Sequence, residues 1–102
     1  MRYFRIDVDN TYFTESIYQA MANDVTDADI EEVAQETMTA LGEANADHID
    51  TEFYWQKRDY NGALEDLLME IENEYYNSLT YQWEEISVED FRMNAEDWIY
   101  GA

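Results

Sequence analysis

The feature that most restricts how this 102-residue chain can fold is its charge: 25 Asp and Glu face only five Lys and Arg, for a formal net charge of −20. Repulsion among so many carboxylates opposes compaction. Yet 46% of the residues are hydrophobic and 16% are aromatic, so the composition is not that of a disordered acidic tail. We therefore expect a folded protein whose acidic surface serves its function.

The composition also argues against several kinds of chemistry. The chain has no cysteine, so disulfides, thiolate nucleophiles and cysteine-ligated metals are excluded. His48 is the single histidine, which excludes a two-histidine zinc site within one chain. No glycine-rich phosphate loop and no Ser-His-Asp pattern is evident. We expect a protein that is not an enzyme, with no catalytic residues, metal or cofactor.

The charge indicates the expected partner, and the lack of long apolar segments indicates the expected cellular compartment. Nucleic acid and anionic lipid both repel a strongly acidic protein, so we expect no direct contact with nucleic acid or membrane. Residues 1–7 lack the apolar stretch of a signal peptide, and no run of eighteen apolar residues occurs. The expected location is the cytoplasm, which is the host bacterial cytoplasm if a phage encodes the chain. The expected partner is a basic DNA-binding protein or nuclease complex.

No proline and no linker interrupts the chain, which indicates one acidic domain over residues 1–102. Apolar residues alternate over residues 2–8, and this predicts an extended N-terminal segment at 1–9 with strand character. From Thr11 the apolar spacing becomes helical, and the helix is expected to end at 23–24. Phe13, Ile17, Ala20 and Met21 form its apolar face.

The clearest helix begins at Thr26. Thr26 and Asp29 resemble a capping box. Apolar side chains then recur at the spacing of one helical face as far as Leu41, and Gly42 is expected to cap or kink this helix. The positions on this face are Ile30, Val33, Ala34, Thr37, Met38 and Leu41.

The segments 43–60 and 78–86 fit a helix and a strand about equally well. Between them, Asn61 is expected to cap a helix with an apolar stripe from Leu64 to Tyr75. Ser87 and Asp90 are expected to cap a last helix, whose inward-facing residues are Val88, Phe91, Ala95 and Trp98. We expect a mainly α fold, with a helical body over 11–100. The alternative is α+β, with a small sheet from 2–8, 49–58 and 79–86.

The candidate site is a set of surface carboxylates that could meet the Arg and Lys of a partner. Carboxylates four residues apart on a helix are about 6 Å apart along its axis, whereas DNA phosphates recur every ~3.4 Å per strand, so several helices or two subunits would be needed to imitate a duplex. The candidate carboxylates are Asp27, Asp29, Glu31, Glu32, Glu36, Glu43, Glu65, Asp66, Glu70, Glu72, Glu74, Glu84, Glu85, Glu89 and Asp90. Trp55, Tyr76 and Trp83 are candidate interface aromatics.

Four short segments occur in order along the chain: residues 11–21 (TYFTESIYQAM), 26–32 (TDADIEE), 48–53 (HIDTEF) and 76–85 (YNSLTYQWEE). Together they resemble Ocr-type anti-restriction proteins of phages. The resemblance implies a mainly helical homodimer that presents carboxylates in place of DNA phosphates and occupies the DNA groove of type I restriction-modification enzymes. The strand-like segment 1–8 and the chain end at 100–102, without an acidic tail, depart from that pattern.

Other functions share the same charge pattern. An anti-CRISPR inhibitor of a Cas effector and an immunity protein for a nuclease toxin are both acidic binders, and a halophile-adapted domain carries acidic residues for solubility. Repulsion between crowded carboxylates also predicts raised pKa values, and hence stability that improves as the pH falls from 7 toward about 5.

Overall fold

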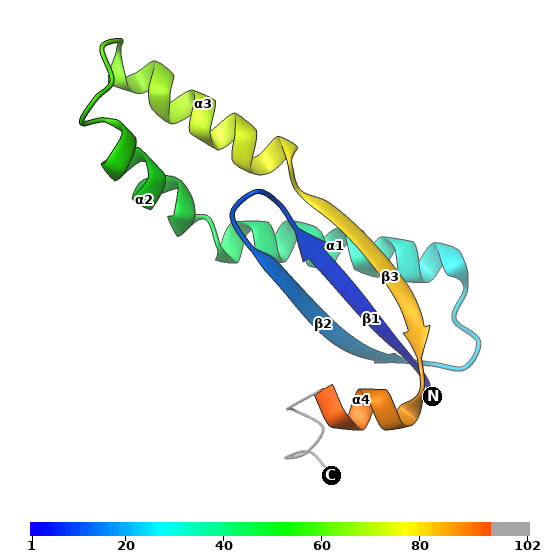
Figure 1. Ribbon diagram of the computed structural model, residues 1–102. Coiled ribbons are helices and arrows are strands. Elements are labelled where there is room, and N and C mark those ends of the chain that lie inside the picture. Colours follow the sequence, from blue (N-terminus) through cyan, green and yellow to red (C-terminus); the bar gives the residue numbers. More distant parts are fainter. Residues whose placement is uncertain (95–102) are drawn as a thin grey trace.

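The computed structural model describes residues 1–94, which form a three-stranded antiparallel sheet and four helices (Figure 1). In chain order the elements are β1 (Arg2–Asp9), β2 (Thr14–Met21), α1 (Asp27–Ala44), α2 (Asp47–Gln56), α3 (Leu64–Asn77), β3 (Thr80–Ile86) and α4 (Val88–Asn94). The fold is therefore α+β. The expectation of a mainly α protein with a helical body over 11–100, which the resemblance to Ocr-type proteins also implied, is wrong.

The sheet has the order β2-β1-β3, so the predicted N-terminal strand is its centre. Ile6 lies opposite Ile17 of β2 and Trp83 of β3. The helix expected after Thr11 is wrong, because β2 pairs with β1 over eight consecutive residue pairs. Asn10 closes the turn between them: its side-chain oxygen accepts hydrogen bonds from the backbone N–H groups of Tyr12 (2.8 Å) and Phe13 (3.0 Å).

The two ambiguous segments adopt different structures. In 43–60 the helical period prevails, since Ile49 and Phe53 lie one turn apart in α2 and pack on the same cluster as Leu67 and Ile71 of α3. A strand at 49–58 is therefore wrong. In 78–86 the alternation of inward and outward side chains prevails, and Thr80–Ile86 pairs with β1 as strand β3.

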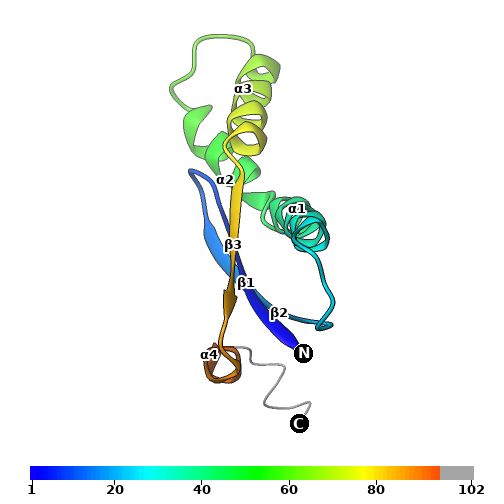
Figure 2. The ribbon, with the colours of Figure 1, turned by 90° about the vertical axis from the view of Figure 1, so that its right-hand side faces the viewer.

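Helix α1 lies over one face of the sheet, as Figure 2 shows. The predicted capping box is confirmed: the Thr26 hydroxyl accepts from the Asp29 backbone N–H at 3.2 Å, and Asp29 accepts from the Thr26 backbone N–H at 3.0 Å. Gly42 lies inside α1, which Asn45 caps. A Cβ at Gly42 would stand 2.7 Å from the Leu79 side chain, so glycine permits the close approach of the chain between α3 and β3.

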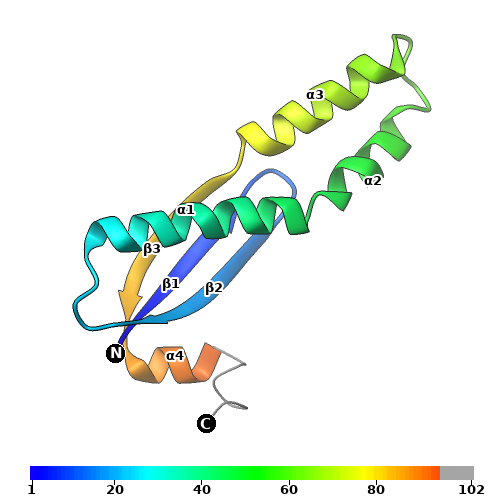
Figure 3. The same ribbon diagram turned by 180° about the vertical axis from the view of Figure 1, so that it is seen from behind.

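The molecule is elongated, with extents of 55 × 29 × 16 Å. Its radius of gyration is 17.4 Å, against about 13 Å for a compact chain of this length. The elongation arises because α2 and α3 form a hairpin that projects beyond one end of the sheet, while α4 lies near the other end (Figures 1 and 3). Within residues 1–94, no helix is both long and apolar enough to cross a bilayer.

Two small apolar clusters hold these parts together. The first joins Ile6 and Val8 of β1 to Ala34 of α1. The second lies in the α2–α3 hairpin and contains Ile49, Leu67, Ile71 and Tyr75. Phe13, in the β1–β2 turn, packs against both clusters, so it links the sheet to the hairpin.

Tyr75 completes this junction between sheet and hairpin. It is fully buried, and its hydroxyl donates a 2.6 Å hydrogen bond to the backbone carbonyl of Gly42 in α1. Its own carbonyl accepts from the Asn10 side-chain amide at 3.0 Å. Burial raises the pKa of the Tyr75 hydroxyl, which keeps it a neutral donor.

Helix α4 packs on the opposite face of the sheet from α1. Ser87 accepts a hydrogen bond from the Asp90 backbone N–H, as the predicted cap requires. The buried ring of Phe91 lies 4.7 Å from that of Tyr3. The inward positions predicted at Ala95 and Trp98 lie outside the described residues.

Tyr75→Phe should lower the free energy of unfolding by about 1–3 kcal/mol, because the buried Gly42 carbonyl loses its donor. Urea denaturation followed by circular dichroism measures the loss. Tyr76→Phe is the matched control, because Tyr76 is the next residue along α3 and is 46% exposed. Equal stability of the two variants would contradict the role given to the Tyr75 hydroxyl.

Candidate functional site: the acidic helices

Helices α1 and α3 carry most of the candidate carboxylates and no Lys or Arg. Together they contribute eleven acidic side chains, six from the 18 residues of α1 and five from the 14 residues of α3. All eleven residues are exposed. Both helices also carry acidic residues in the last turn, Glu43 and Glu74, where the helix dipole disfavours negative charge by about 0.3–1 kcal/mol each. Helix stability therefore does not account for the charges of Glu43 and Glu74.

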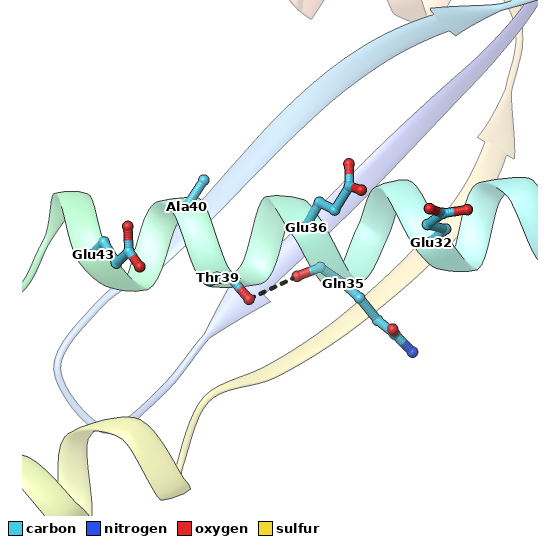
Figure 4. A pocket seen from close by; sticks show the side chains of 6 residues that line it. All are labelled: Glu32, Gln35, Glu36, Thr39, Ala40 and Glu43. Atoms are coloured by element: carbon cyan, nitrogen blue, oxygen red, sulfur yellow. Dashed lines mark hydrogen bonds between the residues drawn. The ribbon is translucent and has the colours of Figure 1, made fainter.

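On α1 the free carboxylates lie on the side that faces away from the sheet. Glu32, Glu36 and Glu43 line a shallow hollow there, together with Gln35, Thr39 and Ala40 (Figure 4). The Thr39 hydroxyl is used within the helix, where it donates to the Gln35 carbonyl at 3.2 Å. What this surface offers a partner is thus chiefly negative charge.

The α2–α3 hairpin carries a second acidic surface. Asp66, Glu70 and Glu74 follow one another at one-turn intervals along α3, about 6 Å apart. Glu72 projects elsewhere on α3, into a groove against α2 that Asp47, Asp50 and Tyr76 also line. The hairpin therefore places a second set of carboxylates beyond the end of the sheet.

Two candidates on α1 also serve the fold. Asp29 caps the helix, and the hydrogen bonds from Thr26, foremost from its backbone N–H, lower the pKa of the Asp29 carboxyl. Glu31 accepts from the Tyr81 hydroxyl at 2.6 Å and from the Trp83 indole N–H at 3.0 Å. These bonds, that of Tyr81 above all, lower the pKa of Glu31. Both shifts run opposite to the direction expected from crowding, because the hydrogen bonds from these donors outweigh the desolvation of the two carboxylates.

The two candidates on β3 are paired with arginines of β1. Glu84 accepts from Arg5 at 2.6 Å, on the sheet face that α1 leaves uncovered. Glu85 accepts both an Nε–H and an Nη–H of Arg2, and these bonds lower the pKa of Glu85. The charge that these two carboxylates present to a partner is accordingly reduced.

The remaining candidates lie near the ends of helices. Asp27 occupies the first turn of α1, Glu65 the first turn of α3, and Glu89 and Asp90 the first turn of α4. All four are exposed. The first turn is where negative charge stabilises a helix, so these residues have a local role as well.

The three candidate aromatics differ in placement. Trp55 is 57% exposed near the end of α2, and Tyr76 lies at the edge of the α2–α3 groove. Trp83 is half-buried on the α1 side of the sheet, where its ring meets that of Phe4 edge to face. Only Trp55 and Tyr76 therefore offer a large ring surface to a partner.

A cluster of cations and aromatic rings at the end of α2 was not anticipated. Lys57 and Arg58 lie over the Tyr54 ring at 5.3 and 5.2 Å, and Arg58 also lies 4.7 Å from the centre of the Trp55 ring. The signal was present in the sequence, since two adjacent cations closely follow three consecutive aromatic residues. We call Tyr54, Trp55, Lys57 and Arg58 the α2 aromatic cluster.

No group of three or more His, Asp or Glu within residues 1–94 is arranged to hold a metal ion.

Comparison with protein-family models, with curated proteins and with solved structures finds nothing that matches this chain. The resemblance to Ocr-type proteins therefore stays a prediction from the sequence.

The Glu31 contacts predict a specific dependence of stability on pH. Because the folded-state pKa of Glu31 lies below its ordinary value of 4.5, ionised Glu31 stabilises the fold above that pH, and the contribution is lost on further acidification. Glu31→Gln should lower the melting temperature at pH 7 and reduce the loss between pH 6 and pH 3.5. Glu36→Gln, on the same helix, is the control and should follow the wild type. Parallel curves for the wild type and Glu31→Gln would contradict this role.

Proposed function

We propose that this protein is a non-enzymatic inhibitor that binds the DNA-binding groove of a bacterial defence enzyme, a type I restriction-modification enzyme or a similar nuclease. Its surface carboxylates take the place of DNA phosphates and meet the Arg and Lys of the groove. One observation carries the proposal: the molecule is elongated, and two of its helices, α1 and α3, together hold eleven exposed acidic residues and no Lys or Arg.

The spacing of these charges supports the proposal. Asp66, Glu70 and Glu74 recur about every 6 Å, close to the ~6.8 Å between alternate phosphates of one DNA strand. The 55 Å length of the molecule corresponds to about 16 base pairs at ~3.4 Å per pair. Helices α1 and α3 together thus supply the several elements that a duplex mimic needs.

A Cas effector is an alternative target, because its DNA channel is also lined with basic side chains. An immunity protein for one nuclease toxin is a different function, and the α2 aromatic cluster favours it. Trp, Tyr and Arg are the residues that dominate compact hot spots, and Trp55 and Tyr54 are 57% and 50% exposed. In that case the acidic helices would steer association and the cluster would supply most of the affinity.

Competition with DNA tests the proposal. A purified type I restriction-modification complex is incubated with a fluorescent duplex that carries its target site, and the protein is added as competitor. We expect stoichiometric displacement that weakens as salt rises. Simultaneous binding of protein and duplex, or no binding to any basic nuclease, would overturn it.

Paired charge-neutralising variants separate the two functions. Glu32→Gln with Glu36→Gln should weaken target binding by about 0.4–2 kcal/mol, as expected for two exposed ion pairs. Asp24→Asn with Asp59→Asn removes the same charge outside the candidate surface and should have little effect. Trp55→Ala should also have little effect under mimicry. A loss confined to Trp55→Ala would favour the immunity-type function instead.

A further inference from the structure

We propose that two copies of this protein pair through the outer edges of β2, forming one continuous six-stranded antiparallel sheet. The inference does not depend on the inhibitor function. It starts from the sheet order, in which β2 is an edge strand whose outer side pairs with no other strand of residues 1–94. Such an edge presents a row of backbone N–H and C=O groups that can pair with another chain.

The edge of β2 lacks the features by which proteins normally prevent such pairing. It is eight residues long, contains no Lys or Pro, and follows β1 without a bulge. Glu15 is its only charged residue, in a chain with a net charge of −20. The other edge strand, β3, carries Glu84 and Glu85. The edge of β2 is therefore the less charged one on which a second, equally acidic copy can dock.

Symmetry restricts the register of this pairing. Directly opposed residues of an antiparallel pair point to the same face of the sheet. A twofold axis that relates the two β2 strands must therefore pass between one residue and the same residue of the second copy. Centred on Ile17, the pairing joins two apolar side chains at the axis and sets Glu15 opposite Gln19 of the second copy. Centred on Tyr18, it would set Glu15 opposite Met21. Of these two registers, only the Ile17-centred one sets the charged Glu15 opposite a polar residue.

Repulsion between the two copies is moderate in this arrangement. The axis is perpendicular to the sheet, so both α1 helices lie on the same face. The two β1 strands are three strand spacings apart, about 14 Å, and α1 packs over β1 and β3 rather than toward the axis. That distance exceeds the screening length of about 8 Å at physiological salt. Dimerisation should accordingly strengthen as salt rises.

A cysteine cross-link tests the axis directly, because the chain has no native cysteine. Residues opposed in an antiparallel pair have Cα atoms about 4.5–5.5 Å apart, within the range that a disulfide spans. Ile17→Cys should therefore form a covalent dimer under mild oxidation, seen on non-reducing gels. Asn73→Cys, on an exposed position of α3, is the control and should remain largely monomeric. Equal cross-linking of the two variants would overturn the Ile17 axis.

Sedimentation equilibrium of the full chain at 50 and 500 mM NaCl tests the association without a cross-link. We expect a dimer that tightens at high salt. Gln19 is exposed, and its side-chain amide donates to the Ala20 carbonyl at 3.1 Å. Circular dichroism of each Gln19 variant verifies that the fold is kept. Gln19→Glu should raise the dimer Kd on the order of tenfold through two symmetry-related like-charge pairs, and Gln19→Lys should lower it.

Asn73→Glu is the control for added charge, and its effect on the dimer Kd should be small. A wild-type chain that stays monomeric at both salt concentrations would overturn the proposal. So would a dimer that Gln19→Glu weakens no more than Asn73→Glu does, because the interface would then lie elsewhere.

Discussion

The contact between Tyr75 and the end of α1 is the interaction on which the arrangement of the whole molecule depends. The two buried clusters are small: three residues lie between β1 and α1, and four, Tyr75 among them, lie within the α2–α3 hairpin. Tyr75 links the hairpin to the rest of the molecule, because its hydroxyl donates to the Gly42 carbonyl of α1 and its carbonyl accepts from the Asn10 side chain in the β1–β2 turn. Three elements distant in sequence thus meet at one residue.

The elongated shape and the charge of the protein are physically linked. A compact globule of this length would crowd about twenty uncompensated negative charges onto a minimal surface, whereas separation lowers the Coulomb repulsion. The projecting hairpin moves the five carboxylates of α3 away from the six of α1. The cost is that each part of the molecule buries little apolar surface, so cross-element hydrogen bonds such as that of Glu31 carry more of the stability.

The sequence predicted the elements whose signals are local and could not predict those that depend on pairing. The Thr26 capping box and the alternation of β1 are local patterns, and both are confirmed. The apolar stripe of α3 is confirmed at Leu67, Ile71 and Tyr75, whereas Leu64 is 47% exposed. The β2 strand was missed because Phe13, Ile17 and Met21 fit a helical period until β1 is available as a pairing partner. For the same reason the engagement of Glu31 was unforeseen, since its donors lie fifty residues later on β3.

The placement of the five cations argues that the acidic surface is arranged rather than scattered. Arg2 and Arg5 lie on β1, where they neutralise carboxylates of β3. Lys57 and Arg58 lie over aromatic rings just past the end of α2, and Arg92 lies in the last turn of α4. None falls within α1 or α3. If charge served solubility alone, cations at the usual one-turn spacing from these carboxylates would stabilise both helices by about 0.2–0.5 kcal/mol per pair. Their absence from the two most acidic helices is what a surface made to meet a cationic partner requires.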